Sequence, residues 1–367
     1  MRFFIRVVVP ILIIIAIIII LGICFMKFWK PFGASPSKED KKTYKRAANY
    51  NFELGSFFNE EEYNLIGNVG ENNFVSTKNT TSKNMIKAEI PTLKENLMLD
   101  DFNVTWFGHS TVLLQMHGMN ILIDPIFSDY ASPVQFMGPK RFSELPLTIS
   151  ELPEIDIVLI SHDHYDHLDY DSVIGLKDKT KQFVVPLGVE NHLERWGIES
   201  EKITAMAWWE EITINNLLIA CTPGRHNSFR LPQNRFDTLW CSFVLRDEYN
   251  TVFYTGDSGY GEHFKDIYEK YGDFNLAILE CGQYDASWKF SHMVPEESVD
   301  VAKILNAKVS LPVHWGTFSI SNHGWDDSVI RFVKKAKMEN LKYAVPKIGE
   351  TFELEDEKTE EWWTNLE

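Results

Sequence analysis

The chain has 367 residues and a formal net charge of −16, from 52 acidic and 36 basic residues. A protein with this negative charge gains little binding energy from the phosphates of a nucleic acid, so we expect no nucleic-acid partner. Three cysteines, Cys221, Cys241 and Cys281, lie outside the apolar N-terminus. Their odd number and wide spacing exclude a disulfide framework and agree with a reducing compartment.

The first predicted element is an apolar N-terminal helix. From Val7 to Met26 no charged residue occurs, and isoleucine dominates. At 1.5 Å per residue such a segment crosses a hydrocarbon core of ~30 Å. Trp29, Lys27 and Lys30 follow it, as aromatic and basic residues do at a membrane interface. We therefore predict a transmembrane anchor within residues 1–30.

A signal peptide is the alternative, because Arg2 and Arg6 precede the apolar segment. The segment is longer than most signal-peptide cores, and small residues typical of a cleavage point do not follow it. An uncleaved, single-pass anchor in the cell membrane is therefore favoured. The positive charges after the segment outnumber those before it, which favours a cytoplasmic location for the rest of the chain. They are Lys27, Lys30, Lys38, Lys41, Lys42, Lys45 and Arg46.

Residues 31–100 are polar, rich in Asn and Lys, and short of periodicity, which indicates a tether and a partly ordered lead-in. Phe52, Phe57, Phe58 and Tyr63 are too apolar for a pure linker. They either pack over the mouth of a site or belong to helical turns on the domain surface. Strands dominate residues 101–355, with helices expected at 189–196, 261–271, 295–305 and 326–338. Residues 356–367 are predicted to form an acidic C-terminal tail.

The most specific motif follows a strand-like segment at residues 155–161, which is apolar and β-branched. Four potential metal ligands come directly after it: His162, His164, Asp166 and His167. In an extended chain His162 and His164 point the same way, while Asp166 and His167 fall where the chain turns toward a helix. Two pairs of ligands then face two adjacent metals. Imidazole and carboxylate suit Zn²⁺, with Mn²⁺ or Fe²⁺ as alternatives.

Three further candidates each follow a strand-like segment: His226 after 217–221, Asp257 after 251–254 and His314 after 309–313. Polar residues just past successive strands meet at one edge of a sheet. His226 and His314 would complete two metal shells, and the two oxygens of Asp257 can hold two cations about 3.5–4 Å apart. Each residue alone could equally belong to a turn or a hydrogen-bonded loop. Together with the first cluster they predict a two-metal site.

These motifs resemble the metallo-β-lactamase superfamily, whose signature is His-x-His-x-Asp-His followed by His, Asp and His at later strand ends. Within it, residues 104–318 are most similar to the branch of N-acyl-phosphatidylethanolamine-hydrolysing phospholipase D and its bacterial relatives. The metal motif alone indicates only the superfamily, whereas the other segments are narrower. They are VTWFGHST at 104–111, DPIFS at 124–128, ASP at 131–133, GPKRF at 138–142, LDY at 168–170 and HWGTF at 314–318.

The resemblance implies an α/β fold, the αββα sandwich, here preceded by the transmembrane helix. It implies that His162, His164 and His226 hold one metal, that Asp166, His167 and His314 hold the other, and that Asp257 bridges the two. Antibiotic-hydrolysing members usually have a cysteine at the bridging position, so Asp257 argues against that activity. His292 matches a position near the scissile group, although it also fits a polar residue ahead of a helix that opens at Pro295.

The expected function is that of a membrane-anchored, binuclear zinc phosphodiesterase acting on N-acyl-phosphatidylethanolamine-like phospholipids. Its nucleophile would be a hydroxide between the metals, because metal binding lowers the pKa of water toward about 7. Asp166, Asp257 and His292 are the predicted catalytic residues, Asp166 also as a proton acceptor. The alternative is a lactonase or other carbon-ester hydrolase of the same fold. The complete ligand set disfavours a non-catalytic membrane scaffold.

Three arginines, Arg225, Arg230 and Arg235, lie close to His226 in sequence. In so acidic a chain they either contact a phosphate or headgroup, together with His292, or are loop arginines paired with nearby acids. The partners predicted are thus the phospholipid substrate and the bilayer. The sequence leaves the oligomeric state open, with a homodimer as one option.

Overall fold

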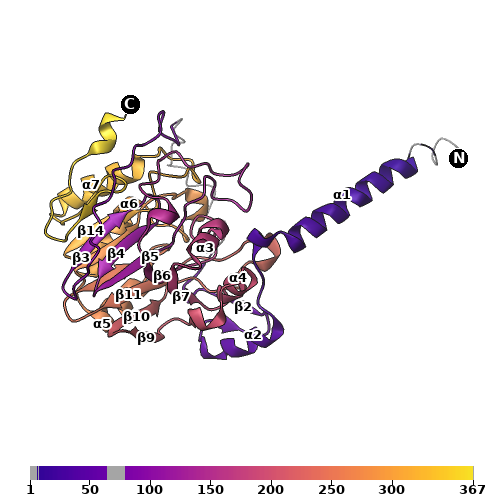
Figure 1. Ribbon diagram of the computed structural model, residues 1–367, viewed down its shortest axis with the longest axis horizontal. Helices are drawn as coiled ribbons and strands as arrows, with labels where there is room; N and C mark the ends of the chain where they lie inside the picture. Colours follow the sequence, from indigo (N-terminus) through magenta and orange to yellow (C-terminus); the bar gives the residue numbers. More distant parts are fainter. Residues whose placement is uncertain (1–5, 7, 64–78, 367) are drawn as a thin grey trace.

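The structure is a computed structural model that describes residue 6, residues 8–63 and residues 79–366. The predictions that involve Arg2, Val7 and residues 64–78 of the lead-in lie outside the described residues. The apolar N-terminal segment forms the helix α1 (Val9–Phe28), which projects from the rest of the molecule (Figure 1).

The helix α1 is apolar on every side. Its most apolar 18 residues have a mean hydropathy of 3.3, and none of the 20 helix residues is buried by the rest of the chain. At 1.5 Å per residue it is about 30 Å long, the thickness of a hydrocarbon core. Within the described residues it is the one helix that meets the length and composition of a membrane span, and a signal sequence would meet them too.

Two mixed sheets pack face to face. Among the described residues, the first has the order β15-β3-β4-β5-β6-β7-β8 and the second β14-β13-β12-β11-β10-β9. Neighbouring strands from β5 to β8, and from β12 to β14, run parallel. The first sheet comprises β3 (Phe102–Trp106), β4 (Val112–Met116), β5 (Met119–Ile123), β6 (Ile155–Leu159), β7 (Thr180–Pro186), β8 (Ile203–Met206) and β15 (Thr351–Phe352); the second comprises β9 (Glu211–Ile214), β10 (Leu217–Thr222), β11 (Ser242–Arg246), β12 (Thr251–Tyr254), β13 (Leu276–Glu280) and β14 (Val309–Val313).

Alternating side chains divide the apolar core into layers. In β12, Val252 and Tyr254 join the central core between the sheets, whereas Phe253 packs outward against Phe264. α3 (Tyr170–Leu176) and α4 (Glu190–Arg195) cover the outer face of the first sheet, and α5 (His263–Tyr271) and α6 (Pro295–Ile304) cover that of the second. The helix α7 (Asp327–Met338) packs beside α6. The predicted αββα sandwich is confirmed, and α3 is the helix toward which the chain was expected to turn after His167, although its bounds were not predicted.

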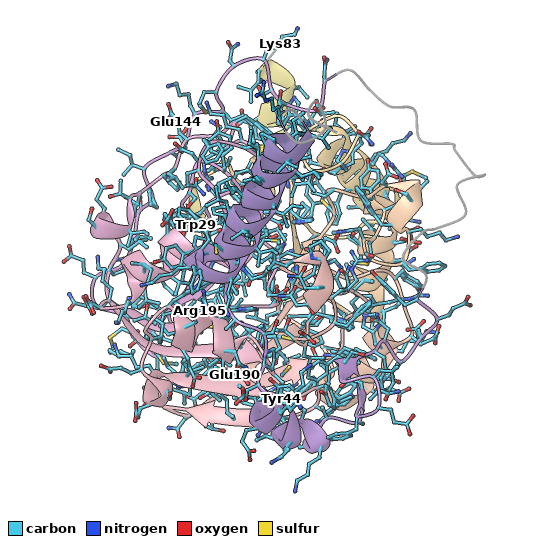
Figure 2. The ribbon with its side chains drawn as sticks, turned by 90° about the vertical axis from the view of Figure 1, so that its right-hand side faces the viewer. Trp29, Tyr44, Lys83, Glu144, Glu190 and Arg195 are labelled. Carbon is cyan, nitrogen blue, oxygen red and sulfur yellow. The ribbon has the colours of Figure 1, made fainter. Side chains whose placement is uncertain are left out.

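The lead-in packs onto the domain through an aromatic cluster. Between residues 31 and 63 the chain forms α2 (Lys38–Thr43), β1 (Tyr50–Asn51) and β2 (Ser56–Phe57). The rings of Tyr44, Tyr50 and Phe57 lie 4.8–5.3 Å apart and are buried with the central core. Phe52 and Phe58 stay exposed. The aromatic residues of this segment thus attach it to the domain, and they do so beside α4 (Figure 2).

The C-terminal segment 356–367, expected to be an acidic tail, contributes to the core in its described part. Trp362 and Trp363 are buried, with ring centroids 5.5 and 5.7 Å from that of Trp315. Trp362 Nε1 donates to Val345 O at 3.1 Å. Two indoles outweigh the surrounding acidic residues here, because burying large aromatic surfaces is strongly favourable.

Candidate metal centre

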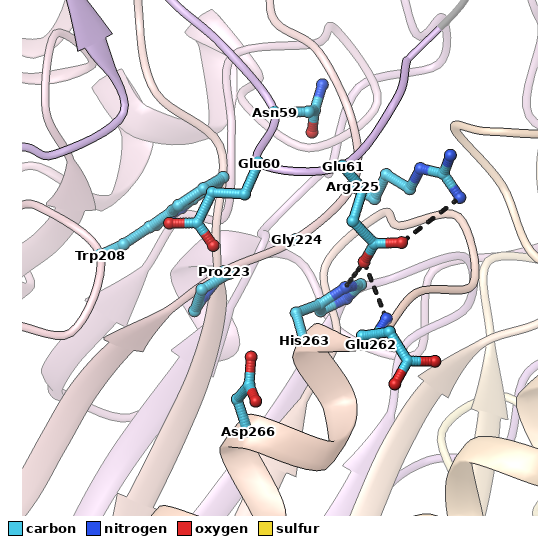
Figure 3. A pocket seen from close by; sticks show the side chains of 10 residues that line it. All are labelled: Asn59, Glu60, Glu61, Trp208, Pro223, Gly224, Arg225, Glu262, His263 and Asp266. Carbon is cyan, nitrogen blue, oxygen red and sulfur yellow. Dashed lines mark hydrogen bonds and ion pairs between the residues drawn. The ribbon is translucent and has the colours of Figure 1, made fainter.

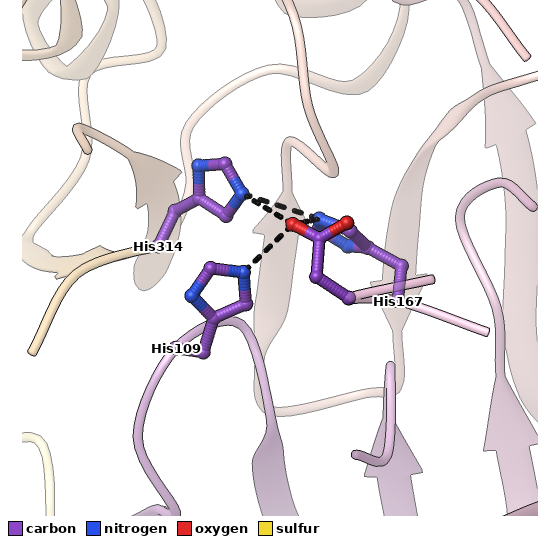
Figure 4. Close-up of side chains that lie close together, drawn as sticks. His109, His167 and His314 are labelled. Atoms are coloured by element: carbon purple, nitrogen blue, oxygen red, sulfur yellow. Dashed lines mark hydrogen bonds and ion pairs between the residues drawn. The ribbon is translucent and has the colours of Figure 1, made fainter. Parts of the chain in front are cut away.

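Among the described residues, three groups of side chains at one edge of the sandwich could hold a metal, and two of them contain the predicted ligands. The third, Asp257, Glu280, His292 and His314, overlaps both. The first contains His162, His164, His226 and Asp257, and the second contains His109, Asp166, His167 and His314. Within each group the potential ligand atoms all lie within 4.8 Å of one another. Figure 4 shows His109, His167 and His314 converging on a carboxylate, that of Asp166. All seven residues predicted as metal ligands lie in the first two groups, and the second group also contains His109, which was not predicted as a ligand.

Asp257 lies between the two groups. Its Oδ2 is 3.2 Å from His167 Nε2 and 3.4 Å from His314 Nε2. The same oxygen is 3.8 Å from the Nε2 atoms of His162 and His226. A carboxylate in this position can contact cations on both sides, which suits a bridging ligand.

The outer ring nitrogens are held by protein groups, which orients the inner nitrogens. His226 Nδ1 donates to Ser291 O at 2.9 Å, and His314 Nδ1 donates to Gly282 O at 3.2 Å. His167 Nδ1 lies 2.7 Å from Asp124 Oδ2. Because a neutral imidazole carries one N–H, each ring presents a lone pair at Nε2 to the interior of the site.

These lone pairs face one another at short range. His226 Nε2 lies 3.2 Å from His164 Nδ1, and His167 Nε2 lies 3.3 Å from His314 Nε2. Among the described residues, the buried atoms Asp257 Oδ1 and His164 Nε2 find no hydrogen-bond partner. Converging acceptors repel each other unless a cation lies between them. The donor set therefore fits divalent metal ions.

The electrostatics favour the protonation states of metal ligands at His162, His226 and Asp257, whereas His167 is drawn toward a positive charge. Burial lowers the pKa of His162 and His226 well below the usual value, so both rings are neutral. Burial alone would raise the pKa of Asp257, but His167 and His314 hold it well below its usual range. For His167 burial is outweighed by neighbouring carboxylates, which raise its pKa well above normal. The carboxylates around His167 thus stabilise a positive charge between them, either a proton on the ring or a bound metal ion.

The backbone is strained at three residues of the site. His109, Asp124 and His314 have φ angles of 49°, 38° and 71°, in the left-handed region that few side chains adopt. Each such residue costs on the order of 1–3 kcal/mol, and such residues cluster at functional sites. The rest of the fold supplies the stability that keeps these three side chains aimed inward.

Three supporting residues were not predicted to act at the site, although two belong to quoted motifs. His109 Nε2 lies 2.9 Å from Asp166 Oδ2. Asp124 receives hydrogen bonds from Ser161, Tyr254 and His167, which fixes the His167 ring. Sequence offered one signal for the third, Glu280: like Asp257, it is a carboxylate at the end of an apolar strand.

Glu280 and His292 form a pair at the edge of the ligand groups. Glu280 is fully buried at the end of β13; its Oε2 accepts from Ser258 N at 2.7 Å, and its Oε1 contacts His292 Nδ1. Burial, with Asp257, raises the pKa of Glu280 well above its usual range, which favours a proton shared with His292. The His292 ring stacks on that of His314, with centroids 5.5 Å apart. The predicted catalytic histidine therefore lies beside the ligands, and its Nδ1 is occupied.

The site opens into a cavity of about 340 Å³. Its rim is largely apolar and includes Ala131, Pro139, Phe229, Trp288 and Ile320, while the ligands form its floor. Tyr63 from the lead-in also lies at the rim, and its hydroxyl is 2.6 Å from Ser291 Oγ. Of the aromatic residues expected over the mouth, the structure thus places Tyr63 there.

The three arginines have different environments, and two predictions of substrate contact are corrected. Arg230 is 3% exposed and donates to the backbone oxygens of Asp163, Leu168 and Pro31. Its guanidinium is therefore committed to the fold. Arg225 donates to Tyr260 O and to Glu62 O and lines a different cavity (Figure 3). Only Arg235 lines the metal cavity, and it makes no ion pair with the residues that the structure describes.

Comparison with known proteins agrees with this geometry. A model of the β-lactamase superfamily domain matches residues 119–315, more than half of the chain. An uncharacterized protein of Mycobacterium tuberculosis is 39% identical over 271 residues, 72% of each chain. N-acyl-phosphatidylethanolamine-hydrolyzing phospholipase D 1 of Caenorhabditis elegans is 34% identical over 256 residues, 65% of this chain and 71% of that protein.

The fold itself recurs in solved structures. A metallo hydrolase of Ignicoccus hospitalis aligns with a TM-score of 0.53 at 23% identity, covering 69% of this chain and 98% of that one. The domain match and the relative from Caenorhabditis elegans support membership of a family and not only a shared fold. The chain belongs to the metallo-β-lactamase superfamily, as a metal-dependent hydrolase that resembles N-acyl-phosphatidylethanolamine-hydrolysing phospholipase D.

Proposed function

We propose that the chain is a membrane-anchored phosphodiesterase of the phospholipase D type, acting on N-acyl-phosphatidylethanolamine-like lipids. The observation that carries the proposal is the pair of ligand groups joined by Asp257, on the floor of a cavity with an apolar rim. The 34% identity to a phospholipase D named for this substrate supports the substrate class. The length and hydropathy of α1 fit a membrane span. We propose that it is an uncleaved anchor, because small residues typical of a cleavage point do not follow it, and that the domain lies on the cytoplasmic side, where positive charges flank the span.

The ligand groups define where the metals belong. His162, His164 and His226 would hold one metal, Asp166, His167 and His314 the other, and Asp257 both. The bound metals, which we propose to be zinc, would supply positive charge that lowers the pKa of water toward about 7 and offsets the charge of the phosphate. Asp166 has a pKa well below its usual range and so acts as a hydrogen-bond acceptor that orients the attacking water.

His292 is placed to protonate the leaving group. Its Nδ1 is taken by Glu280, so its Nε2 is the atom that delivers a proton to the headgroup oxygen. The water oxygen bonds to phosphorus as the bond to the headgroup oxygen breaks, and the headgroup leaves as an alcohol. The other product is a phosphatidic acid. Glu280 holds the ring in place and can return a proton to it, as a carboxylate partner does for a catalytic histidine.

A carbon-ester hydrolase of the same fold is the second candidate, because among the described residues Arg235 is the one arginine or lysine that lines the cavity. Of the three arginines predicted to bind phosphate, only Arg235 lines it. An anionic substrate gains from Arg235, whereas a neutral lactone or ester does not. The oligomeric state stays a proposal in either case, with a homodimer as the option to test.

The test uses the purified full chain with zinc in phospholipid vesicles that contain N-acyl-phosphatidylethanolamine. We expect release of phosphatidic acid, measured by mass spectrometry, and little turnover of a neutral lactone. Replacing Arg235 with Gln should raise KM for the phosphodiester and leave KM for any neutral ester unchanged. Turnover of the lactone without phosphatidic acid from any phospholipid would transfer the assignment to the second candidate.

A further inference from the structure

The loop of residues 130–140 connects the root of α1 with the rim of the metal cavity. Its base is closed by pairing of Tyr130 with Lys140, and Ala131 N donates to Pro139 O at 3.0 Å. Ala131 and Pro139 line the metal cavity. Further along the loop, Pro133 O accepts a 2.6 Å hydrogen bond from Trp29 Nε1, just after α1 ends. The loop is therefore held at both the active site and the helix.

The tip of this loop is apolar and unusually exposed. Phe136 is 77% exposed and Met137 is 65% exposed, at consecutive positions. The side chains of Phe28 and Trp29 next to it are also exposed. A lone exposed hydrophobic residue needs no explanation, but a contiguous group beside an apolar helix indicates a contact with lipid or protein.

A groove of about 510 Å³ lies between the loop and the root of α1. Its walls are mainly apolar and include Phe28, Trp29, Pro133, Val134, Phe136 and Tyr170. Lys30 also lines it, and Arg195 lies close by, donating to Lys27 O at 2.9 Å. Figure 2 looks along α1 and shows Trp29 and Arg195 at its base. Aromatic residues with a polar end, followed by cations, suit the boundary between acyl chains and headgroups.

We propose that the tip of the 130–140 loop inserts into the bilayer leaflet next to α1, and that the groove takes an acyl chain. The proposal rests on the membrane anchoring proposed above. α1 fixes the height of the surface: its apolar residues end at Phe28, and Phe28 itself lines the groove. A bilayer that contains α1 therefore reaches the groove. With α1 as the first membrane contact, the loop tip would be the second, and the two together would set the tilt of the domain. The base of the 130–140 loop would then hold the metal cavity toward the lipid surface.

The position of the loop tip is tested by fluorescence in the full chain, without turnover. Cys221, Cys241 and Cys281 are buried, so a thiol-reactive fluorophore labels Cys24 or an introduced cysteine. In a Cys24→Ser background, the reporters are Phe136→Cys and, as a second position, Met137→Cys. The matched control is Met338→Cys, which is 71% exposed at the end of α7, far from α1. Vesicles of phosphatidylcholine and phosphatidylglycerol carry a nitroxide lipid.

We expect the nitroxide lipid to quench most of the fluorescence at 136 and 137 and none at 338. Equal, weak quenching at all three, with native Cys24 strongly quenched, would overturn the loop insertion while leaving the anchor intact. If labelled Cys24 is not quenched either, α1 is outside the bilayer and both proposals about the membrane fail. Because no substrate is turned over, the result is independent of whether the enzyme cleaves phospholipids. Metal content of each variant checks that it is folded.

Discussion

Two neighbouring cavities contain histidine and carboxylates, and only one of them has the geometry of a metal site. The acidic cavity, of about 220 Å³, is lined by Glu60, Glu61, Glu262, Asp266 and His263 (Figure 3). Its histidine already has a carboxylate partner: Glu61 lies 3.5 Å from His263 Nδ1 and 4.0 Å from Arg225 Nη1. In the metal cavity, by contrast, the outer nitrogens are occupied and the lone pairs converge.

The difference shows that residue types alone do not make a metal site. Glu61 and His263 satisfy each other, as a hydrogen-bonded pair in a partly exposed position does. His167 and His314 cannot satisfy each other, because Asp124 and Gly282 O already hold their outer nitrogens. The hydrogen bonds to the outer ring nitrogens thus determine which cluster of side chains can bind a cation.

The largest effect should follow from removing the bridging carboxylate. We expect Asp257→Ala to lower both metal content and kcat/KM by orders of magnitude, because Asp257 Oδ2 is the atom shared by the two ligand groups. Wild type should hold about two metals per chain, measured by plasma mass spectrometry. Glu61→Ala in the acidic cavity is the control and should keep the full metal content. Normal occupancy in Asp257→Ala would remove the bridging role.

A smaller loss should follow from releasing the ring of His167. Asp124→Asn keeps the size of the side chain but removes the charge that holds His167 Nδ1 at 2.7 Å. Loss of such an outer partner typically costs 10–100-fold in metal affinity or activity. The control is Asp300→Asn, a partly exposed carboxylate on α6 with one weak contact, 3.6 Å from Lys335. Competition with a chelator measures the metal affinity. Equal metal affinity in Asp124→Asn and Asp300→Asn would contradict the role of Asp124 in orienting His167.

The two cavities also differ in which part of the lead-in braces them: residues 31–34 contact groups around the metal motif, whereas Asn59, Glu60 and Glu61 line the acidic cavity. Arg230 joins Pro31 O to the backbone oxygens of Asp163 and Leu168, and Ala34 N donates to His192 Nδ1. A chain that begins at Lys38 should therefore be less stable than one that begins at Phe28 by about 1–3 kcal/mol, the cost of buried unpaired groups. Both lack the anchor. Urea unfolding compares them, and equal stability would exclude the bracing role.

The smallest effect concerns the acidic cavity itself. The hydrogen bond from His263 is the main cause that lowers the pKa of Glu61 below 4.5. A carboxylate with a depressed pKa stabilises the fold above its unfolded pKa, and this contribution is lost as the pH falls through the folded pKa. Glu61→Gln should thus cost roughly 0.2–1 kcal/mol at pH 7 and progressively less below about pH 4.5. Thermal unfolding across this range measures it; a difference independent of pH would contradict the pairing.

Much of the fold was predictable because its signals are local. The apolar strands and the helices near 261–271, 295–305 and 326–338 follow from periodicity and from start signals such as Pro295. A helix was expected after the metal motif, but the bounds of α3 were not predicted, because seven residues are too few for a clear periodic pattern. The packing of Trp362 and Trp363 was missed because acidic neighbours hide their contact with Trp315, 47 and 48 positions earlier in the chain.

The sequence by itself determined seven of the eight residues in the two ligand groups, all except His109. His162, His164, Asp166 and His167 are close in sequence, and His226, Asp257 and His314 each follow an apolar strand, so spacing and strand ends suffice to find them. Tertiary structure alone decided that Asp124 and Glu280 orient the ligands and His292, and that Arg230 braces the fold. The physical reason is distance along the chain: Asp124 meets His167 across 43 residues, and Arg230 meets Pro31 across 199. Such pairs depend on sheet order and register, which no local pattern encodes.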